Sequence, residues 1–241
     1  MIEVNGLRKI WRREGKTVGL LGVGFTIPDG QIVGVLGENG AGKTTLLRLM
    51  AGLLQPQSGT VLFDGRPAAA QYARISYMTG EGSYYPTLTV GEYGQLLAEL
   101  NPNFDARRYD SFLNYFALEK ADVIGRMSTG QRARLELAAG FAKRADYYLM
   151  DEPFLGKDPF TRRDFIKLMG ATLHGNETIL LSTHYLEDVE HFLDRALILH
   201  KGSLADDVLT DALHERGETL LQRMADVCHW NGAHHLEFDA G

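Results

Sequence analysis

The sequence contains one cysteine in 241 residues, and its apolar runs are short. Cys228 has no second thiol with which to form an internal disulfide, so a packed core has to stabilise the fold, and a chain of this length can supply one. Runs such as Thr178 to Leu181 and Ala196 to Leu199 are far shorter than the roughly 20 residues of a transmembrane helix. The first residues lack the basic and apolar segments of a secretion signal. We therefore expect a protein of the reducing cytoplasm that does not itself span a membrane.

An excess of positive charge is also missing. Lys and Arg total 25 against 31 Asp and Glu, which gives a formal net charge of −6. Binding to nucleic acid or to an anionic lipid surface through charge alone is therefore disfavoured, and we expect no nucleic-acid partner. The hydrophobic fraction of 44% and the charged fraction of 23% are ordinary for a globular domain and exclude a disordered chain.

Short apolar runs alternate with stretches of helical periodicity. The apolar runs are mostly continuous, as expected for parallel strands that are buried on both faces of a sheet. They cover residues 32–36, 61–63, 147–150, 178–181 and 196–199, and the helical stretches cover 44–51, 161–173 and 185–194. This alternation predicts βαβ units in an α/β fold. Asp29-Gly30, Asp64-Gly65 and Lys201-Gly202 each predict a tight turn between strands, so we also expect a peripheral antiparallel β subdomain.

The character of the sequence changes between about residues 87 and 143, where helix formers and aromatic residues replace the apolar strand runs. We interpret this segment as a helical lobe inserted into an α/β core that comprises about residues 1–86 and 144–205. The tail, about residues 206–241, is predicted to be a short C-terminal extension that is helical through Ala225. All of these parts belong to a single domain.

The clearest motif is a phosphate-binding loop between a predicted strand and a predicted helix. Gly37-Glu38-Asn39-Gly40-Ala41-Gly42-Lys43-Thr44 matches the pattern G-x-x-x-x-G-K-[ST], and Thr45 follows it in the helix. The glycines let the backbone turn its N–H groups toward phosphates, and the start of the helix favours the same anion. We expect Lys43 to reach the β and γ phosphates of a nucleotide and the Thr44 hydroxyl to bind Mg²⁺. The motif predicts a P-loop NTPase core with a mostly parallel sheet.

A phosphate loop requires acidic residues for the metal and for catalysis. The apolar run from Tyr147 to Met150 ends in Asp151 and Glu152. At the end of a buried strand, Asp151 is suited to hold Mg²⁺, generally through water. Glu152 adjoins this metal site without being needed as a ligand. We therefore predict that Glu152 orients and polarises the attacking water.

Further motifs follow in an order that resembles the ATP-binding cassette (ABC) family over nearly the whole chain. Met127-Ser128-Thr129-Gly130-Gln131 resembles the family signature, Leu-Ser-Gly-Gly-Gln, and stands before Asp151. Gly156-Lys157-Asp158-Pro159 resembles the loop after the metal-binding strand, with Asp158 at its acidic position. His184, after Ser182-Thr183, resembles the histidine that contacts the γ-phosphate, and Trp11 stands where an aromatic residue stacks on adenine.

The resemblance implies that two ATP molecules are sandwiched between two ATPase subunits, in a homodimer or a heterodimer. Ser128, Thr129, Gly130 and Gln131 of one subunit would then face the γ-phosphate that the phosphate loop of the other subunit holds. The residues by themselves also allow plainer roles, with Ser128 as a helix cap and Trp11 as an apolar residue at a sheet edge. The cap and ligand roles of Ser128 are compatible, and we expect both.

Some positions depart from the family pattern. Thr129 replaces the first glycine of the signature, Phe154 a common threonine and Lys157 a common leucine. A glutamine that binds the metal and the water, and senses the membrane partner, usually follows the strand before the helical lobe. Gly80 aligns with that glutamine and Glu81 comes next. Either the role is lost, or Glu81 fulfils it with a shift of one residue.

The segment from Glu81 to Glu92, followed by a short helical lobe, resembles most closely the ATPases of ABC-2-type exporters. This resemblance implies an ATPase subunit that powers a separate transmembrane permease through ATP-driven dimerisation, on the cytoplasmic face of the cell membrane. An importer ATPase with similar motifs is one alternative. A soluble ABC ATPase of translation or DNA repair is another, although such proteins usually carry two cassettes or a long coiled-coil insertion.

Overall fold

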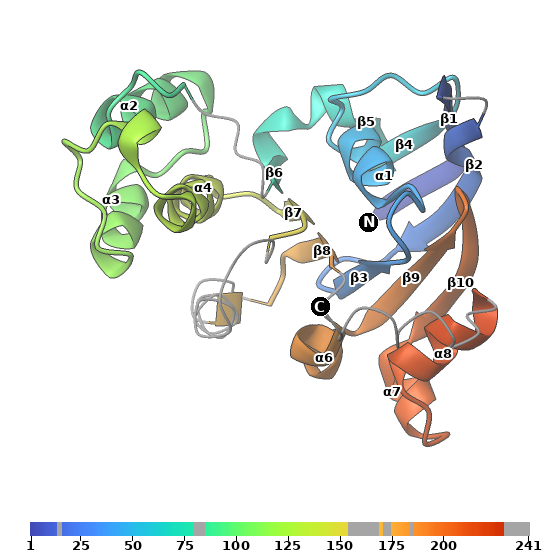
Figure 1. The fold of residues 1–241 in the computed structure, drawn as a ribbon. Helices are drawn as coiled ribbons and strands as arrows, with labels where there is room; N and C mark the ends of the chain where they lie inside the picture. Colours follow the sequence, from blue (N-terminus) through green and yellow to red (C-terminus); the bar gives the residue numbers. More distant parts are fainter. Residues whose placement is uncertain (14–15, 80–84, 154–168, 171–174, 184–185, 229–241) are drawn as a thin grey trace.

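The computed structural model describes residues 1–13, 16–79, 85–153, 169–170, 175–183 and 186–228. Two sheets, the helices beside them and a further group of helices that stands apart from the smaller sheet make up this part of the molecule (Figure 1). None of the helices within these ranges is both long enough and apolar enough to cross a membrane.

The larger sheet has six strands in the order β10-β9-β3-β8-β7-β6. Its strands are β3 (Ile32–Leu36), β6 (Ile75–Thr79), β7 (Tyr147–Asp151), β8 (Thr178–Ser182), β9 (Arg195–His200) and β10 (Ser203–Leu209). Neighbours pair in parallel except for β9 and β10, and every residue of β7 and β8 is buried, as the continuous apolar runs predict. Val35 and Asp151 both lie beside Ser182, so the strands end together at one edge of the sheet.

The smaller sheet is antiparallel, with four strands in the order β2-β1-β4-β5, and it confirms the predicted antiparallel subdomain. Its strands are β1 (Ile2–Arg13), β2 (Lys16–Ile27), β4 (Ser58–Phe63) and β5 (Arg66–Pro67). Helix α1 (Lys43–Met50) packs against both sheets, because Leu20 of β2, Leu46 of α1 and Leu149 of β7 belong to one buried cluster. Two 3₁₀ turns, η1 (Ala68–Ala70) and η2 (Tyr72–Arg74), connect β5 to β6.

The helical lobe is built from α2 (Val90–Leu100), α3 (Ala106–Tyr115), the 3₁₀ turn η3 (Ile124–Arg126) and α4 (Thr129–Ala142). Buried aromatic side chains, among them Tyr109, Phe112 and Phe141, form its core. The Tyr109 hydroxyl donates to the carbonyl of Val90 at 2.9 Å, which ties α3 to α2. In the described residues of this lobe the only strand pairing consists of isolated bridges, so the predicted helical character is confirmed.

The prediction that the tail is helical from residue 206 is wrong at its start. Residues 203–209 form β10, because the backbone pairs with β9 and Asp207 forms an ion pair with Arg195 of that strand. Two helices follow, α7 (Thr210–His214) and α8 (Leu220–Val227), and the chain leaves the helical conformation between them at Gly217, where φ is 71°. The tertiary pairing of β10 overrides its local helix propensity.

Two further predictions need correction. The helix expected at 185–194 is reduced to α6 (Leu186–Val189) and the 3₁₀ turn η4 (Glu190–Phe192), because Asp194 instead exchanges hydrogen bonds with the backbone of Ile32 as the chain enters β9. The turn at Asp29-Gly30 connects β2 to β3, which belong to different sheets, and therefore closes no hairpin. The helix predicted at 161–173 lies outside the described residues, except for positions 169 and 170.

Candidate functional site

The phosphate-loop motif lies between β3 and α1, at the carboxyl edge of the larger sheet. Gly42 precedes the helix with φ of 110°, a conformation that glycine adopts without the strain of a side chain, and no side chain caps the helix start. The first N–H groups of a helix have no acceptor within it, so the amides of Lys43, Thr44 and Thr45 face outward from the helix end. Such a helix start binds anions through these amides and the helix dipole.

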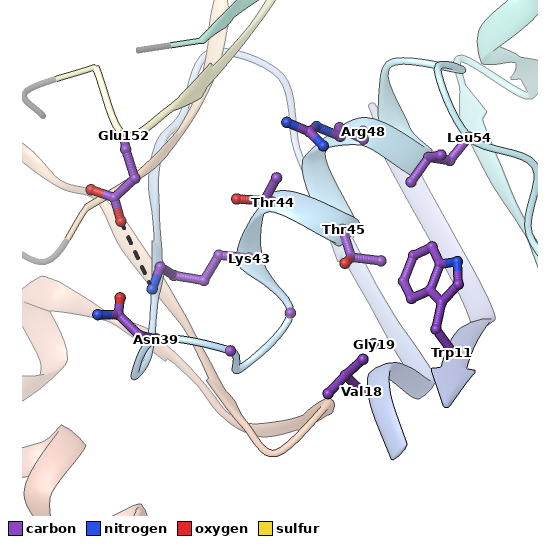
Figure 2. A pocket seen from close by; sticks show the side chains of 12 residues that line it. Trp11, Val18, Gly19, Asn39, Lys43, Thr44, Thr45, Arg48, Leu54 and Glu152 are labelled. Carbon is purple, nitrogen blue, oxygen red and sulfur yellow. Dashed lines mark ion pairs between the residues drawn. The ribbon is translucent and has the colours of Figure 1, made fainter. Parts of the chain in front are cut away.

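A cavity of about 470 Å³ opens at this helix start (Figure 2). Its lining residues are Trp11, Val18, Gly19, Asn39, Gly40, Gly42, Lys43, Thr44, Thr45, Arg48, Leu54 and Glu152. Most of the residues predicted to bind nucleotide are among them. Gly37 and Ala41 are instead buried and Glu38 is exposed, and these three do not line the cavity. Figure 2 shows Trp11 and Glu152 on opposite sides of the loop, and both line the cavity.

Lys43 is directed across the phosphate loop. Its side chain is only 7% exposed, and its Nζ donates to the carbonyls of Gly37 at 2.7 Å and Glu38 at 3.3 Å. The same nitrogen lies 3.8 Å from Glu152 Oε1 (Figure 2). Burial lowers the pKa of Lys43, and the negative charges of Glu152 and Asp151 partly oppose that effect. A phosphate in the cavity would therefore meet a cation that is already positioned and poorly hydrated, which strengthens their attraction.

Asp151 receives hydroxyl donors from three different elements. It is 4% exposed at the end of β7. Its Oδ1 accepts hydrogen bonds from Thr44 Oγ1 at 3.0 Å and Ser182 Oγ at 2.8 Å, and its Oδ2 accepts one from the Tyr77 hydroxyl at 3.3 Å. These three hydrogen bonds fix the orientation of the carboxylate.

The sequence motifs assign no role to Tyr77, Ser182 or Arg48, although each contributes to the site. Arg48 Nε donates to the Tyr77 hydroxyl at 3.4 Å, and burial raises the pKa of Tyr77 to about 12, so the phenol remains a donor at neutral pH. A hydroxyl residue in a strand is a weak signal for such a role, because β6 also contains Ser76 and Thr79 and β8 also contains Thr178. The parallel register places Ser182 directly beside Asp151, whereas Tyr77 lies beside Leu149 and reaches Asp151 through its hydroxyl.

Glu152 follows β7 in an uncommon backbone conformation. Its φ is 48°, in the left-handed region that residues other than glycine rarely adopt. Its N–H donates to Ser182 Oγ at 2.9 Å, which holds the turn against β8. The side chain is 18% exposed and lines the cavity opposite Thr45 and Trp11. Strained conformations of this kind concentrate at functional sites, and here the turn directs the carboxylate toward Lys43.

The oxygen atoms of Thr44 and Asp151 fit a Mg²⁺ ion. The hydroxyl and the carboxylate are 3.0 Å apart at the edge of the cavity, and both are the hard oxygen donors that this ion prefers. Among the described residues there is no cluster of three or more His, Cys, Asp or Glu side chains of the kind that would hold a metal without a substrate. Mg²⁺ at phosphate sites usually takes one or two carboxylates and completes its shell with phosphates and water, so this donor set suffices.

Trp11 forms the far wall of the cavity from β1. Its side chain is 36% exposed, and Lys9 Nζ lies 5.7 Å from the ring centroid. An exposed aromatic face beside a phosphate-binding helix start is suited to stack on a planar base. This position in the cavity wall is compatible with the predicted stacking of Trp11 on adenine. It is equally compatible with a role as an apolar residue at the sheet edge.

The signature segment lies away from this cavity. Ser128 Oγ accepts from the N–H of Gln131 at 3.2 Å, and the Gln131 side chain accepts from the N–H of Ser128 at 2.9 Å, which makes a capping box at the start of α4. Ser128, Thr129 and Gly130 are exposed, and none of the signature residues lines the cavity. The predicted cap is therefore present, whereas the ligand role stays a prediction. His184 and Asp158 lie outside the described residues, as do Gly80, Glu81, Phe154 and Lys157.

Comparison with known proteins identifies the family. Residues 20–155 match the family model described as "ABC transporter". The chain is 35% identical over 221 residues to ABC transporter ATP-binding protein YtrB of Bacillus subtilis, covering 89% of this chain and 74% of that protein. It is 34% identical over 211 residues to Nod factor export ATP-binding protein I of Ralstonia nicotianae, covering 84% and 65%. A solved ATP-binding subunit of an ABC transporter superposes with a TM-score of 0.82 at 27% identity, covering 94% of this chain and 99% of that one. The α/β fold, the phosphate loop and these matches together show that the chain belongs to the ABC transporter family, as an ATPase domain.

Proposed function

We propose that this chain hydrolyses ATP with Mg²⁺ and thereby powers a separate transmembrane permease that exports its cargo. The observation that carries the proposal is the convergence of Lys43, Thr44, Asp151 and Glu152 at one edge of the larger sheet. A cation, two metal-binding oxygens and a carboxylate within one site are the groups that phosphoryl transfer to water requires.

Each residue has a distinct task in hydrolysis. The amides at the start of α1 and the Lys43 ammonium bind the β and γ phosphates and stabilise the negative charge that develops on the transferred group. Mg²⁺, when bound by Thr44 and Asp151, neutralises phosphate charge. The Glu152 carboxylate orients a water molecule for in-line attack and accepts its proton, so ATP and water yield ADP and phosphate. Tyr77 and Ser182 keep Asp151 in place through their hydroxyls.

The exposed signature segment supports a dimeric working form. Ser128 and Gly130 stand at the start of a long helix, a position suited to bind phosphate, yet they lie outside the cavity of their own chain. A second copy or a related subunit would bring such a segment to this cavity and complete it. We propose that two ATP molecules are enclosed in this way, with His184 and Asp158 contributing as the family resemblance implies.

The export direction and the membrane location rest on similarity. A relative at 34% identity is named for Nod factor export, and export agrees with the ABC-2-type layout around residues 81–92. The permease would hold the ATPase at the cytoplasmic face of the membrane. The cargo would be selected by the permease.

Two measurements test the proposal. The purified chain should release phosphate from ATP only when Mg²⁺ is present, and addition of EDTA should stop the release. The chain should also copurify from detergent with a polytopic membrane protein encoded beside it. Hydrolysis without any membrane partner, in a chain that instead copurifies with ribosomes or DNA repair proteins, would contradict the transport function.

A further inference from the structure

The turn between β9 and β10 lies outside the cavity, yet it contacts both of the cavity's walls. We infer that Gly202, in this turn, is a positioning residue that sets the distance between the phosphate loop and the base-side wall, which we define as Trp11, Val18 and Gly19. The inference rests on the ATP binding proposed above. It assigns to the turn a part in nucleotide affinity, although the turn does not touch the nucleotide.

Hydrogen bonds connect Gly202 to both sides. The N–H of Gly202 donates to the carbonyl of Ala41 in the phosphate loop at 3.1 Å. The carbonyl of Gly202 accepts from the N–H of Leu21 in β2 at 2.8 Å. Leu21 follows Gly19 by two residues, so Gly202 bridges the loop that would bind phosphates and β2, the strand that carries Val18 and Gly19 of the base-side wall.

Steric contacts show how closely the turn fits. A Cβ atom on Gly202 would lie 2.4 Å from the carbonyl oxygen of Gly19 and 3.2 Å from Leu21 Cγ. A backbone oxygen cannot move aside as the end of a flexible side chain can, so any side chain at 202 has to displace β2 or the turn itself. Gly19 in turn packs under the indole, because a Cβ there would lie 3.1 Å from Trp11 Cε3. A displacement at Gly202 would therefore be transmitted to Trp11.

The structure contains a matched turn that lacks these contacts. Lys201 and Gly202 have φ values of 47° and 84°, and Asp64 and Gly65, in the turn between β4 and β5, have φ values of 48° and 71°. Replacing either glycine by alanine imposes a similar backbone strain. A Cβ on Gly65, however, would have nothing within 4 Å. Comparison of the two variants separates the strain of the turn from the contact with Gly19.

The inference predicts that substitution of Gly202 weakens the binding of a long ligand more than that of a short one. ATP would reach from the phosphate loop to the base-side wall, so its affinity depends on the spacing of the two. Inorganic tripolyphosphate carries the same phosphate chain without a base and would contact only the loop. A change in spacing should therefore weaken ATP binding and leave tripolyphosphate binding nearly unaltered, since loss of orientation between two binding regions is costly only to a ligand that uses both.

The experiment measures the Kd of ATP and of tripolyphosphate, both with Mg²⁺, by isothermal titration of the full chain. For Gly202→Ala we expect the ATP affinity to fall about tenfold or more and the tripolyphosphate affinity to change by less than about threefold, while Gly65→Ala changes both by less than about twofold. In a Trp11→Ala background, Gly202→Ala should weaken ATP binding by less than about threefold, because the base-side contact is already lost.

The outcomes separate this inference from the proposed function. If the unaltered chain binds neither ligand, the proposed ATP binding fails. If it binds both, but Gly202→Ala weakens both equally or neither, the positioning role is overturned. Should Gly202→Ala not fold, hydrogen exchange of the unaltered chain replaces it. ATP should then slow exchange in the peptides containing Leu21 and Gly202 more than tripolyphosphate does, and equal protection by the two ligands would overturn the inference.

Discussion

The helices α1 and α4 begin in opposite ways, although we propose that both starts bind phosphate. Helix α1 starts after Gly42 with no side-chain cap, whereas α4 starts with a capping box formed by Ser128 and Gln131. The first helix thus leaves its terminal amides to a ligand, and the second satisfies part of its own donors. The start of α1 lines a cavity with Lys43, whereas the start of α4 is exposed and does not line that cavity.

This difference explains why one site is recognisable in a single chain and the other is not. At the start of α1, several residues of the phosphate loop and Lys43 line the same cavity. At α4 a phosphate would have to share Ser128 with the cap, and it would need a surface from a second subunit to be enclosed. We therefore expect mutations at the start of α1 to impair nucleotide binding in the isolated chain. Mutations at the start of α4 should impair nucleotide binding only in the assembled dimer.

The largest expected effect is that of Lys43→Ala. Removal of the buried ammonium takes away the cation beside the β and γ phosphates, and we expect ATP turnover to fall by about 10³-fold. Phosphate release under saturating Mg²⁺ measures it. Lys120→Ala is the control, because Lys120 is 60% exposed in an ion pair with Asp110 on the helical lobe and should leave turnover unchanged. Undiminished turnover in Lys43→Ala would contradict the assignment of the site.

The next effect in size is that of Glu152→Gln. The amide has nearly the shape of the carboxylate but is a poor proton acceptor, so we expect turnover to fall by about 10²-fold while ATP still binds. ATP that is bound and not hydrolysed should then hold two chains together by mass action. Light scattering with and without ATP measures the association, and Glu99→Gln, on an exposed face of α2, serves as the control. A variant that stays monomeric with ATP, also when mixed with candidate partner subunits, would argue against a sandwich dimer.

Substitutions at Ser128 separate the cap from the proposed ligand role. Ser128→Ala should lower the free energy of unfolding by about 1 kcal/mol through loss of the cap. Thr89→Ala removes the matching capping box of α2, so it should cost a similar amount without affecting turnover of the dimer.

Ser128→Asp tests the remaining role. Aspartate caps helices well, so stability should be retained, but its charge repels phosphate, and we expect turnover of the assembled form to fall by about tenfold. Thermal unfolding and ATPase assays at high protein concentration measure the two effects. Full turnover in Ser128→Asp would show that α4 approaches no phosphate.

The smallest expected effects are at the hydroxyls around Asp151. Tyr77→Phe and Ser182→Ala each remove one donor to this carboxylate, and a less firmly oriented Asp151 should bind Mg²⁺ more weakly. We expect the Mg²⁺ concentration at half-maximal ATP turnover to rise by about three- to tenfold, with a smaller change in maximal turnover. Titration of ATP-bound protein with Mg²⁺ by calorimetry provides a readout independent of activity. An unchanged Mg²⁺ affinity in both variants would show that Thr44 alone holds Asp151 in place.

Much of the fold and the site can be predicted from the sequence because their determinants are local. The phosphate loop and the Ser128 cap are contiguous segments in which spacing alone specifies the backbone, and the apolar runs specify buried strands. The tail could not be predicted in the same way. The Lys201-Gly202 turn predicts a strand after it, but no local pattern reports that this strand continues through residues 206–209, which pair with β9.

The sequence by itself determined which chemical groups the chain offers, namely the loop amides, Lys43 and the carboxylates of Asp151 and Glu152. The tertiary structure decided how those groups are oriented. Thr44 and Asp151 are 107 residues apart in the sequence and 3.0 Å apart in space, and Glu152 is held in its strained turn by Ser182 of the next strand. The contact of Gly202 with both walls of the cavity is equally non-local. The physical reason is that strand register and sheet packing set the distances between residues that are far apart in the sequence. Register and packing depend on the burial of apolar side chains over the whole core, and not only on the two residues in contact.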